Sequence, residues 1–273
     1  MKVDVTAVGG VLLGLVAIVM GFVLEGGRAT ALLEPTAAII VFGGTFGATM
    51  VSFSLAEVKR FPQYFKTALI SLDYDPVALI DALCRWADVM RKDRLRGLEA
   101  ARKETHDRFL SRGLQLLIDG KKVDEMQAVL ETDLYTEQEV MKGGSKVFEA
   151  AGGFAPTMGI AGTVMGLIHV LADLAGGAAA LGAAIGLAFI ATLYGVGSAN
   201  LVWLPLSSNL KNKAVQQYKL RQIALDAFLL MGQEGGISPL ALRPRLLAHI
   251  EAADPRAGTP DPAPRPAPAR RTG

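Results

Sequence analysis

Four long stretches without a charged residue restrict the fold of this chain more than any other feature. Residues 5–24, 35–56, 150–172 and 174–210 contain no Asp, Glu, Lys or Arg. A spanning helix needs about 20 apolar residues, and a Lys or Arg at its centre costs about 3 kcal/mol on insertion scales. The fourth stretch is longer than one span, so we expect a span over 181–206 after a short apolar loop, "LAGGAAA". The pattern predicts an all-α polytopic membrane protein with four transmembrane helices and a helical cytoplasmic domain.

The composition fits helices that pack closely in lipid. Hydrophobic residues make up 51% of the chain and aromatic residues only 7%, while 30 residues are glycine. Small residues let helix backbones approach each other in a membrane. The net charge of +2 is too small to indicate nucleic-acid binding. We interpret residues 5–24 as a retained span, because the run has spanning length and the following "EGGR" is a weak signal-peptide cleavage site.

Basic residues indicate how the spans are oriented. The link between the first two spans holds one Arg against two Glu, and the link between the last two holds only Asp173. The positive-inside rule therefore places both termini and the large segment 57–149 in the cytoplasm. The cytoplasmic flanks carry Lys59, Arg60, Lys66, Lys142, Lys146, Lys211, Lys213, Lys219 and Arg221.

Helix start and stop signals divide the remainder of the chain. Asp75 followed by Pro76 begins one expected helix, Gly120 ends another, and Ser238 followed by Pro239 begins a third. The segment 124–150 could run directly into the third span. We found no convincing strand pattern. The expected division is 1–56 (spans one and two), 57–149 (cytoplasmic helices), 150–206 (spans three and four), 207–253 (cytoplasmic helices) and 254–273 (a disordered Pro, Ala and Arg tail).

The sequence offers no support for an enzyme. It has one cysteine, Cys84, so neither a disulfide framework nor a Cys/His metal spacing is present. His106, His169 and His249 lie in unrelated contexts, and no Gly-rich loop has the Lys-Ser/Thr ending of a phosphate-binding loop. We expect no catalytic residues, no resident metal and no cofactor.

The third and fourth spans carry small and polar residues that a lipid-facing helix does not need. Gly162 and Gly166 form one small pair at a spacing of four, Gly182 and Gly186 form another, and Gly195 follows. Such pairs favour contact with other helices. Ordinary helix packing accounts for the glycines without any further function.

The hydroxyl groups are less easily explained. Thr163 and Thr192 lie at similar depth in two spans that must pack together, and oxygen atoms are the ligands a dehydrated hard cation needs. A single Thr can instead bond its own preceding carbonyl. Pro156 and Pro205 each free a carbonyl one turn back. Intramembrane acids usually mark ion paths, yet these spans hold none and only His169 can titrate. We therefore expect the charged group to come from another chain.

The motifs "APTMGIAGTVMGLIHVL" (155–171) and "ATLYGVGSANLVWLPLSSNLK" (191–211) resemble the flagellar-motor stator A subunits, the MotA/PomA family, which is related to ExbB/TolQ. The resemblance covers the whole chain. It implies a ring of five A subunits around two B subunits of the MotB/PomB type, each bringing an aspartate in its single span. It also implies that cation flow across the inner membrane turns the ring, which is surrounded by membrane lipid.

The resemblance also assigns roles to individual residues. Pro156 and Pro205 fall on the family's two functional prolines, and Arg91 and Glu99 fall on the charged pair that contacts the rotor protein FliG. Within "RKDRLRGLE", Arg94 and Arg96 replace a glycine and a leucine of the usual pattern, which puts the detail of the rotor contact in doubt.

The transported ion is assigned from a second group of residues. Thr163, Thr192 and Tyr194 resemble sodium-driven members, whereas His169 resembles proton-driven ones. Sodium is therefore favoured, with the proton as the alternative.

Two other classes stay open. An ExbB/TolQ-like energiser of envelope transport would use the same ion chemistry, although such proteins usually have three spans. A non-conducting scaffold would need only the small residues. A secondary transporter is disfavoured because the chain lacks inverted repeats and intramembrane charge.

Overall fold

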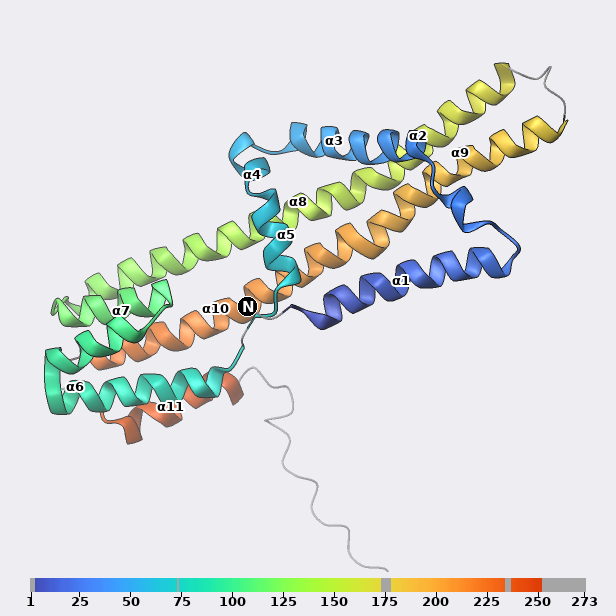
Figure 1. The fold of residues 1–273 in the computed structure, drawn as a ribbon. Coiled ribbons are helices and arrows are strands. Elements are labelled where there is room, and N and C mark those ends of the chain that lie inside the picture. The colour runs from blue at the N-terminus through green and yellow to red at the C-terminus, as the bar shows by residue number, and fades with distance from the viewer. Residues whose placement is uncertain (1–2, 73, 173–177, 234–236, 252–273) are drawn as a thin grey trace, which may run out of the picture. The chain divides into compact units, whose positions relative to one another are not determined.

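The computed structural model describes residues 3–72, 74–172, 178–233 and 237–251. Within these ranges all regular elements are helices. One isolated antiparallel bridge also forms between Val3 and Ile70. The all-α prediction is confirmed (Figure 1). Four helical segments of the described chain are long and apolar enough to cross a membrane, as expected from the four uncharged stretches.

The chain forms two compact units. The span unit comprises 1–73 and 137–215, and the helical unit comprises 74–136 and 216–273. Residues 57–72 and 137–149, which the sequence division grouped with the cytoplasmic segment, thus pack in the span unit.

The first half of the span unit begins with α1 (Val5–Leu24), whose bounds match the predicted first span. The second span is a composite of α2 (Pro35–Ala38), the π-helix η2 (Ile39–Gly43) and α3 (Gly44–Ser52), preceded by the 3₁₀ turn η1 (Ala29–Leu32). It ends at Ser52 rather than at residue 56, because Phe53 is extended and Ser54 caps the next helix.

Two short helices that the sequence did not reveal follow the second span. These are α4 (Leu55–Lys59) and α5 (Phe61–Leu69). The start of α4 is fixed by a capping box, in which Ser54 and Glu57 exchange side-chain and backbone hydrogen bonds. The amphipathic α5 packs Tyr64 and Ala68 into a cluster with Phe148 of a later helix.

The third and fourth spans lie within long helices. The helix α8 (Val123–Ala172) runs without interruption for 50 residues, so the expected continuation into the third span is confirmed. The fourth span consists of α9 (Ala178–Ser198), the π-helix η4 (Ala199–Trp203) and the start of α10 (Leu204–Gly232). Because α9 begins at Ala178, the end of the expected loop "LAGGAAA" is helical, while residues 174–177 lie outside the described chain.

The helical unit contains α6 (Pro76–Glu104), α7 (Arg108–Ile118), α11 (Pro239–Glu251) and parts of α8 and α10. The predicted boundaries are confirmed: the Asp75 carboxylate accepts from the Ala78 amide at 2.8 Å, and Gly120 ends α7 with a φ of +63°. The Ser238 hydroxyl accepts from the Ala241 amide at 3.2 Å. The tail 254–273 lies outside the described chain.

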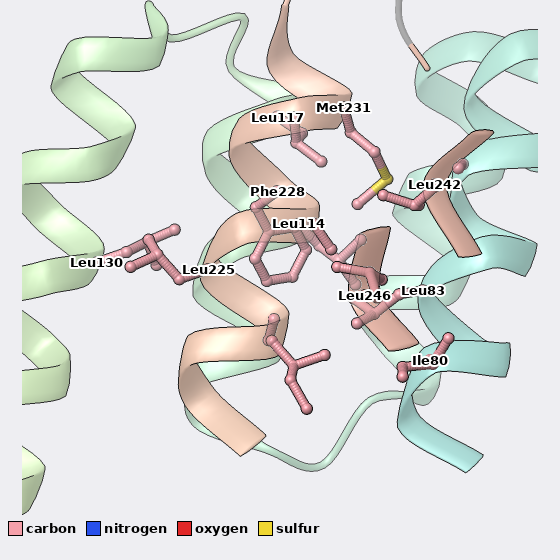
Figure 2. Packing of buried hydrophobic residues seen from close by; sticks show 14 of the residues in the cluster. Ile80, Leu83, Leu114, Leu117, Leu130, Leu225, Phe228, Met231, Leu242 and Leu246 are labelled. Atoms are coloured by element: carbon pink, nitrogen blue, oxygen red, sulfur yellow. The ribbon is translucent and has the colours of Figure 1, made fainter. Parts of the chain in front are cut away.

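One apolar core holds the helical unit together. Figure 2 shows Leu242 and Leu246 of α11 beside Leu83 of α6, and Phe228 of α10 beside Leu114 of α7. A Cβ atom added to Gly113 would lie 2.2 Å from the Phe228 ring, so α7 and α10 approach closely there. The buried set also includes Ile80, Leu98, Phe109, Leu117, Met126, Leu130, Leu225 and Met231.

Candidate functional site

The backbones of α8 and α9 touch at two glycines. A Cβ atom on Gly195 would lie 2.5 Å from the carbonyl oxygen of Ala155, and one on Gly159 would lie 2.9 Å from that of Ala191. Real Cβ atoms essentially never approach heavy atoms this closely, so both positions require glycine. The contact is the one expected of small residues in membrane helices. The two helices run side by side along this contact (Figure 1).

The predicted glycine pairs divide into two groups. Gly162 and Gly166 face α9, since a Cβ atom on either would lie 2.7 Å from the Cβ of Ala191 or Ala188. Gly182 and Gly186 behave differently: a Cβ atom there would meet no described atom within 4 Å.

The two threonines of the predicted ion path are in contact. The Thr163 and Thr192 hydroxyl oxygens lie 2.5 Å apart, and both residues are half-buried. The Thr163 hydroxyl also lies 3.2 Å from the Gly159 carbonyl oxygen and 3.0 Å from that of Ala188. A hydroxyl has one proton, so Thr163 donates to one of these oxygens at a time. Four oxygen atoms therefore gather at one level of the α8–α9 contact.

Tyr194 has different partners from the threonines. Its hydroxyl donates to the Leu32 carbonyl in a short hydrogen bond and accepts from the Glu34 amide at 3.0 Å. Its ring stacks on Phe42, with the ring centroids 6.0 Å apart. Tyr194 thus holds the segment between the first two spans against α9. Its place in the ion path stays a prediction.

The two prolines mark different irregularities. Pro156 lies half-buried inside α8, next to Ala155, whose carbonyl faces Gly195. Pro205 is exposed and is the second residue of α10, directly after the π-helix η4. A proline has no N–H to donate to the carbonyl four residues earlier. The π-helix therefore ends where Pro205 removes the regular hydrogen bond.

A cavity of about 320 Å³ lies between α2 and the α8–α9 pair. Among its described lining residues Glu34 is the only carboxylate. The remainder of the lining is small or apolar: Thr36, Ala37, Ile40, Gly162, Met165, Gly166, Val170, Ala188 and Ala191. In the described chain no group of three or more His, Cys, Asp or Glu side chains is placed to hold a metal ion.

The predicted rotor-contact residues are exposed on α6. Arg91 and Glu99 lie eight residues apart, which corresponds to about 12 Å along a helix axis. Leu83 and Leu98 of the same helix face the core of the helical unit. Within the described residues neither Arg91 nor Glu99 forms an ion pair. Arg96 is also exposed, and the side chain of Arg94 lies outside the described part.

The span unit contains a buried ion pair that was not predicted from the sequence. The Lys213 ammonium lies 3.0 Å from the Asp4 carboxylate, and their side chains are only 8% and 15% exposed. The ammonium also donates to the carbonyl oxygens at the end of α5, at 2.7 Å to Ala68 and 2.6 Å to Ile70. The pair therefore joins the start of α1, the end of α5 and α10.

Asp4 also caps α1. Its carboxylate accepts from the Thr6 hydroxyl at 2.7 Å and from the Ala7 amide at 3.1 Å. Hydrogen bonds from Thr6, Lys213, Ala7 and Asn209 hold the pKa of Asp4 well below its ordinary value, although partial burial opposes them. An Asp directly before an apolar run is an N-cap signal that the sequence carried, but nothing in the sequence pointed to Lys213.

These features define a multi-pass helical membrane protein whose last two spans meet at glycines and share a hydroxyl pair. Residues 101–223 match the MotA/TolQ/ExbB proton channel family, and residues 8–97 match the N-terminal domain of motility protein A. The chain belongs to the MotA family of flagellar stator subunits.

Individual relatives agree over most of the chain. Motility protein A of Bacillus subtilis is 31% identical to this chain, and the aligned region covers 92% of each sequence. PomA, a chemotaxis protein of Vibrio alginolyticus, is 29% identical over 83% of this chain and 88% of its own. A solved MotAB structure from C. jejuni matches with a TM-score of 0.83 at 27% identity, covering 93% of this chain and 98% of that one. The B. subtilis MotAB stator complex matches with a TM-score of 0.80 at 31% identity, covering 89% and 95%.

Proposed function

We propose that this chain is the A subunit of a flagellar stator that couples cation flow across the bacterial inner membrane to torque on the rotor. A B subunit would supply the carboxylate that the four spans lack, in line with the similarity of this chain to solved MotAB structures. One observation carries the proposal: the Thr163–Thr192 hydroxyl pair lies where α8 and α9 touch, in spans without any acid.

The chemistry of this arrangement favours an alternating mechanism. A partner's carboxylate at a dry helix interface costs several kcal/mol while it is charged and unpaired. Binding a cation or a proton neutralises it and lets it pass apolar neighbours. One elementary charge that crosses 100 mV supplies about 2.3 kcal/mol. Repeated neutralisation and release would step a ring of A subunits, which we expect to number five around two B subunits.

We favour sodium as the transported ion and retain the proton as the alternative. The support is chemical, since the Thr163 hydroxyl and the three oxygen atoms within hydrogen-bonding distance of it offer oxygen ligands to a hard cation. We further propose that both termini and the helical unit are cytoplasmic, and that Arg91 and Glu99 contact a FliG-type rotor protein.

Swimming of a motile strain that lacks its own stator tests the proposal. The strain would express this chain with its B partner, and sodium would be titrated at constant pH and ionic strength. We expect the speed to rise with sodium and to vanish without it. A speed that is indifferent to sodium makes the proton the transported ion. An absence of swimming, with both chains confirmed in the membrane, would contradict the stator proposal or its match to that rotor.

An ExbB/TolQ-like energiser is the second candidate, because the family that matches residues 101–223 includes those proteins. The match of residues 8–97 to motility protein A favours the stator. Restored envelope transport without restored swimming would reverse this preference.

A further inference from the structure

A second cavity, of about 170 Å³, lies in the span unit away from the threonine pair. It is formed by α3, the α4–α5 pair, α8 and the π-helix η4, and nearly all of its lining is apolar. The lining residues are Thr45, Phe46, Thr49, Met50, Val58, Phe61, Pro62, Val147, Ala151 and Trp203.

Two hydrogen-bond donors in this lining have no partner. The Thr45 hydroxyl and the Trp203 Nε1 are buried, and neither finds an acceptor among the described residues. Their residues are only 1% and 8% exposed. A buried donor without an acceptor costs about 1–3 kcal/mol. Thr49 differs, because its hydroxyl donates to the Thr45 carbonyl at 2.8 Å. Two unsatisfied donors on residues that line one apolar cavity indicate an apolar ligand that brings an acceptor.

The position of the cavity selects the kind of ligand. Thr45 lies about two helical turns inside the end of the second span at Ser52, whereas Val58 and Pro62 lie beyond that end. The cavity thus reaches from the hydrocarbon region to the membrane boundary. At the surface Phe46 and Met50 are 45% and 53% exposed, so the opening is apolar. Water is a poor occupant, because a buried water needs two to four polar partners.

Charge at the boundary fits a phosphate. Lys59 and Arg60 separate Val58 from Phe61, two residues that line the cavity, and both are exposed. Neither forms an ion pair with another described residue. Basic residues beside a span attract anionic lipid headgroups by about 1 kcal/mol each.

We propose that this cavity binds an anionic glycerophospholipid of the surrounding membrane. An acyl chain enters beside the exposed Phe46 and Met50. An ester carbonyl accepts hydrogen bonds from the Trp203 indole and the Thr45 hydroxyl, and the phosphate meets Lys59 and Arg60. The inference is independent of the stator proposal, since it concerns binding and not ion flow.

Native mass spectrometry of the full chain, purified from membranes with its B partner, tests this site. Dioleoyl phosphatidylglycerol and dioleoyl phosphatidylcholine would be titrated separately. We expect saturable retention of phosphatidylglycerol, and weaker retention of phosphatidylcholine. Thr45→Val and Trp203→Phe should each weaken phosphatidylglycerol binding by roughly 3- to 10-fold, the range for one hydrogen bond. Thr45→Ser keeps the donor and should bind like the unmodified chain.

Thr49→Val is the matched control, because it is the same change in the same helix and cavity but removes a hydroxyl that already has a partner. Binding that is unsaturable, or equal in Thr45→Val, Trp203→Phe and Thr49→Val, would overturn the proposal. A loss confined to Lys59→Gln and Arg60→Gln would also overturn it by showing attraction to the headgroup alone. A disulfide between two copies carrying Met50→Cys would assign the cavity to a second copy of the chain instead.

Discussion

At the residue scale, two hydroxyls should decide the ion preference. Thr163 contacts the Thr192 hydroxyl and two carbonyl oxygens, so removing both hydroxyls leaves only the carbonyl oxygens of this group among the described residues. We expect the double variant Thr163→Ala, Thr192→Ala to lose at least tenfold in apparent sodium affinity, about the energy of one charged hydrogen bond. The measurement is swimming speed against sodium concentration. Thr163→Ser, which keeps the hydroxyl, is the control, and an unchanged sodium dependence in the double variant would remove the hydroxyls from the ion path.

The Asp4–Lys213 pair should matter for stability rather than for ion choice. Asp4→Asn leaves the buried Lys213 ammonium without its counter-charge, a loss of about 3 kcal/mol. Thermal unfolding of the purified complex at pH 6 measures this cost. Asp4→Asn with Lys213→Met removes both charges and should recover part of the stability. A double variant less stable than Asp4→Asn alone would contradict this account.

The same pair predicts a pH dependence. The folded chain favours ionised Asp4, because its pKa lies below the ordinary value of about 3.9. The stabilisation is therefore fully present above that value and is lost as the pH falls toward the lower pKa of the folded state. Between pH 6 and pH 3, the difference in melting temperature between the unmodified chain and Asp4→Asn should narrow. A difference that stays constant over this range would show that Asp4 ionisation is not responsible.

The residue scale is also where sequence reasoning succeeded and failed most clearly. Thr163 and Thr192 were placed together correctly, because each lies at a known depth in an uncharged helix. The contact of Asp4 with Lys213 was not predicted, because it depends on how the end of α5 packs beside both residues. The Tyr194 hydrogen bonds with Leu32 and Glu34 depend in the same way on a turn between spans.

At the scale of elements, the glycine contact between α8 and α9 should tolerate no side chain. Gly195→Ala places a Cβ atom 2.5 Å from the Ala155 carbonyl oxygen, and the helices must separate at a cost of about 1–3 kcal/mol. We expect a lower melting temperature and lost or weakened swimming. Gly182→Ala in the same helix meets no described atom within 4 Å and is the matched control. Equal behaviour of the two variants would show that the close contact is not required.

The elements themselves were predictable to different degrees. Charge-free length identified four spans, and the caps at Asp75, Gly120 and Ser238 were read correctly because each acts through neighbouring residues. The short helices α4 and α5 were missed, since one of them is only five residues long. The π-helices η2 and η4 were missed as well, because a single wider turn leaves little trace in hydrophobic periodicity.

At the scale of the whole molecule, the exposed charges of α6 should affect torque without affecting folding. Arg91 and Glu99 are outside the core of the helical unit. Arg91→Glu or Glu99→Arg should therefore change the free energy of unfolding by less than about 0.5 kcal/mol. Swimming should nevertheless fall severely if these charges meet a rotor. Leu98→Ala, in the same helix but buried, should instead destabilise the chain by about 2–5 kcal/mol. Normal swimming in both charge-reversal variants would exclude these residues from the rotor contact.

The glycine contact has a genetic consequence. Every missense change of a glycine codon, at either of its first two nucleotides, adds at least a Cβ atom to the chain. Gly159 and Gly195 face backbone at distances that leave no room for that atom, and each lies opposite the other. A screen that saturates both codons and recovers swimming cells should therefore return glycine alone, whereas the codon of Gly182 should return alanine and serine among its survivors. Second-site changes that partly restore swimming to a Gly195 variant should then fall at residues in the contact between α8 and α9. They should not fall at residues that contact the ion.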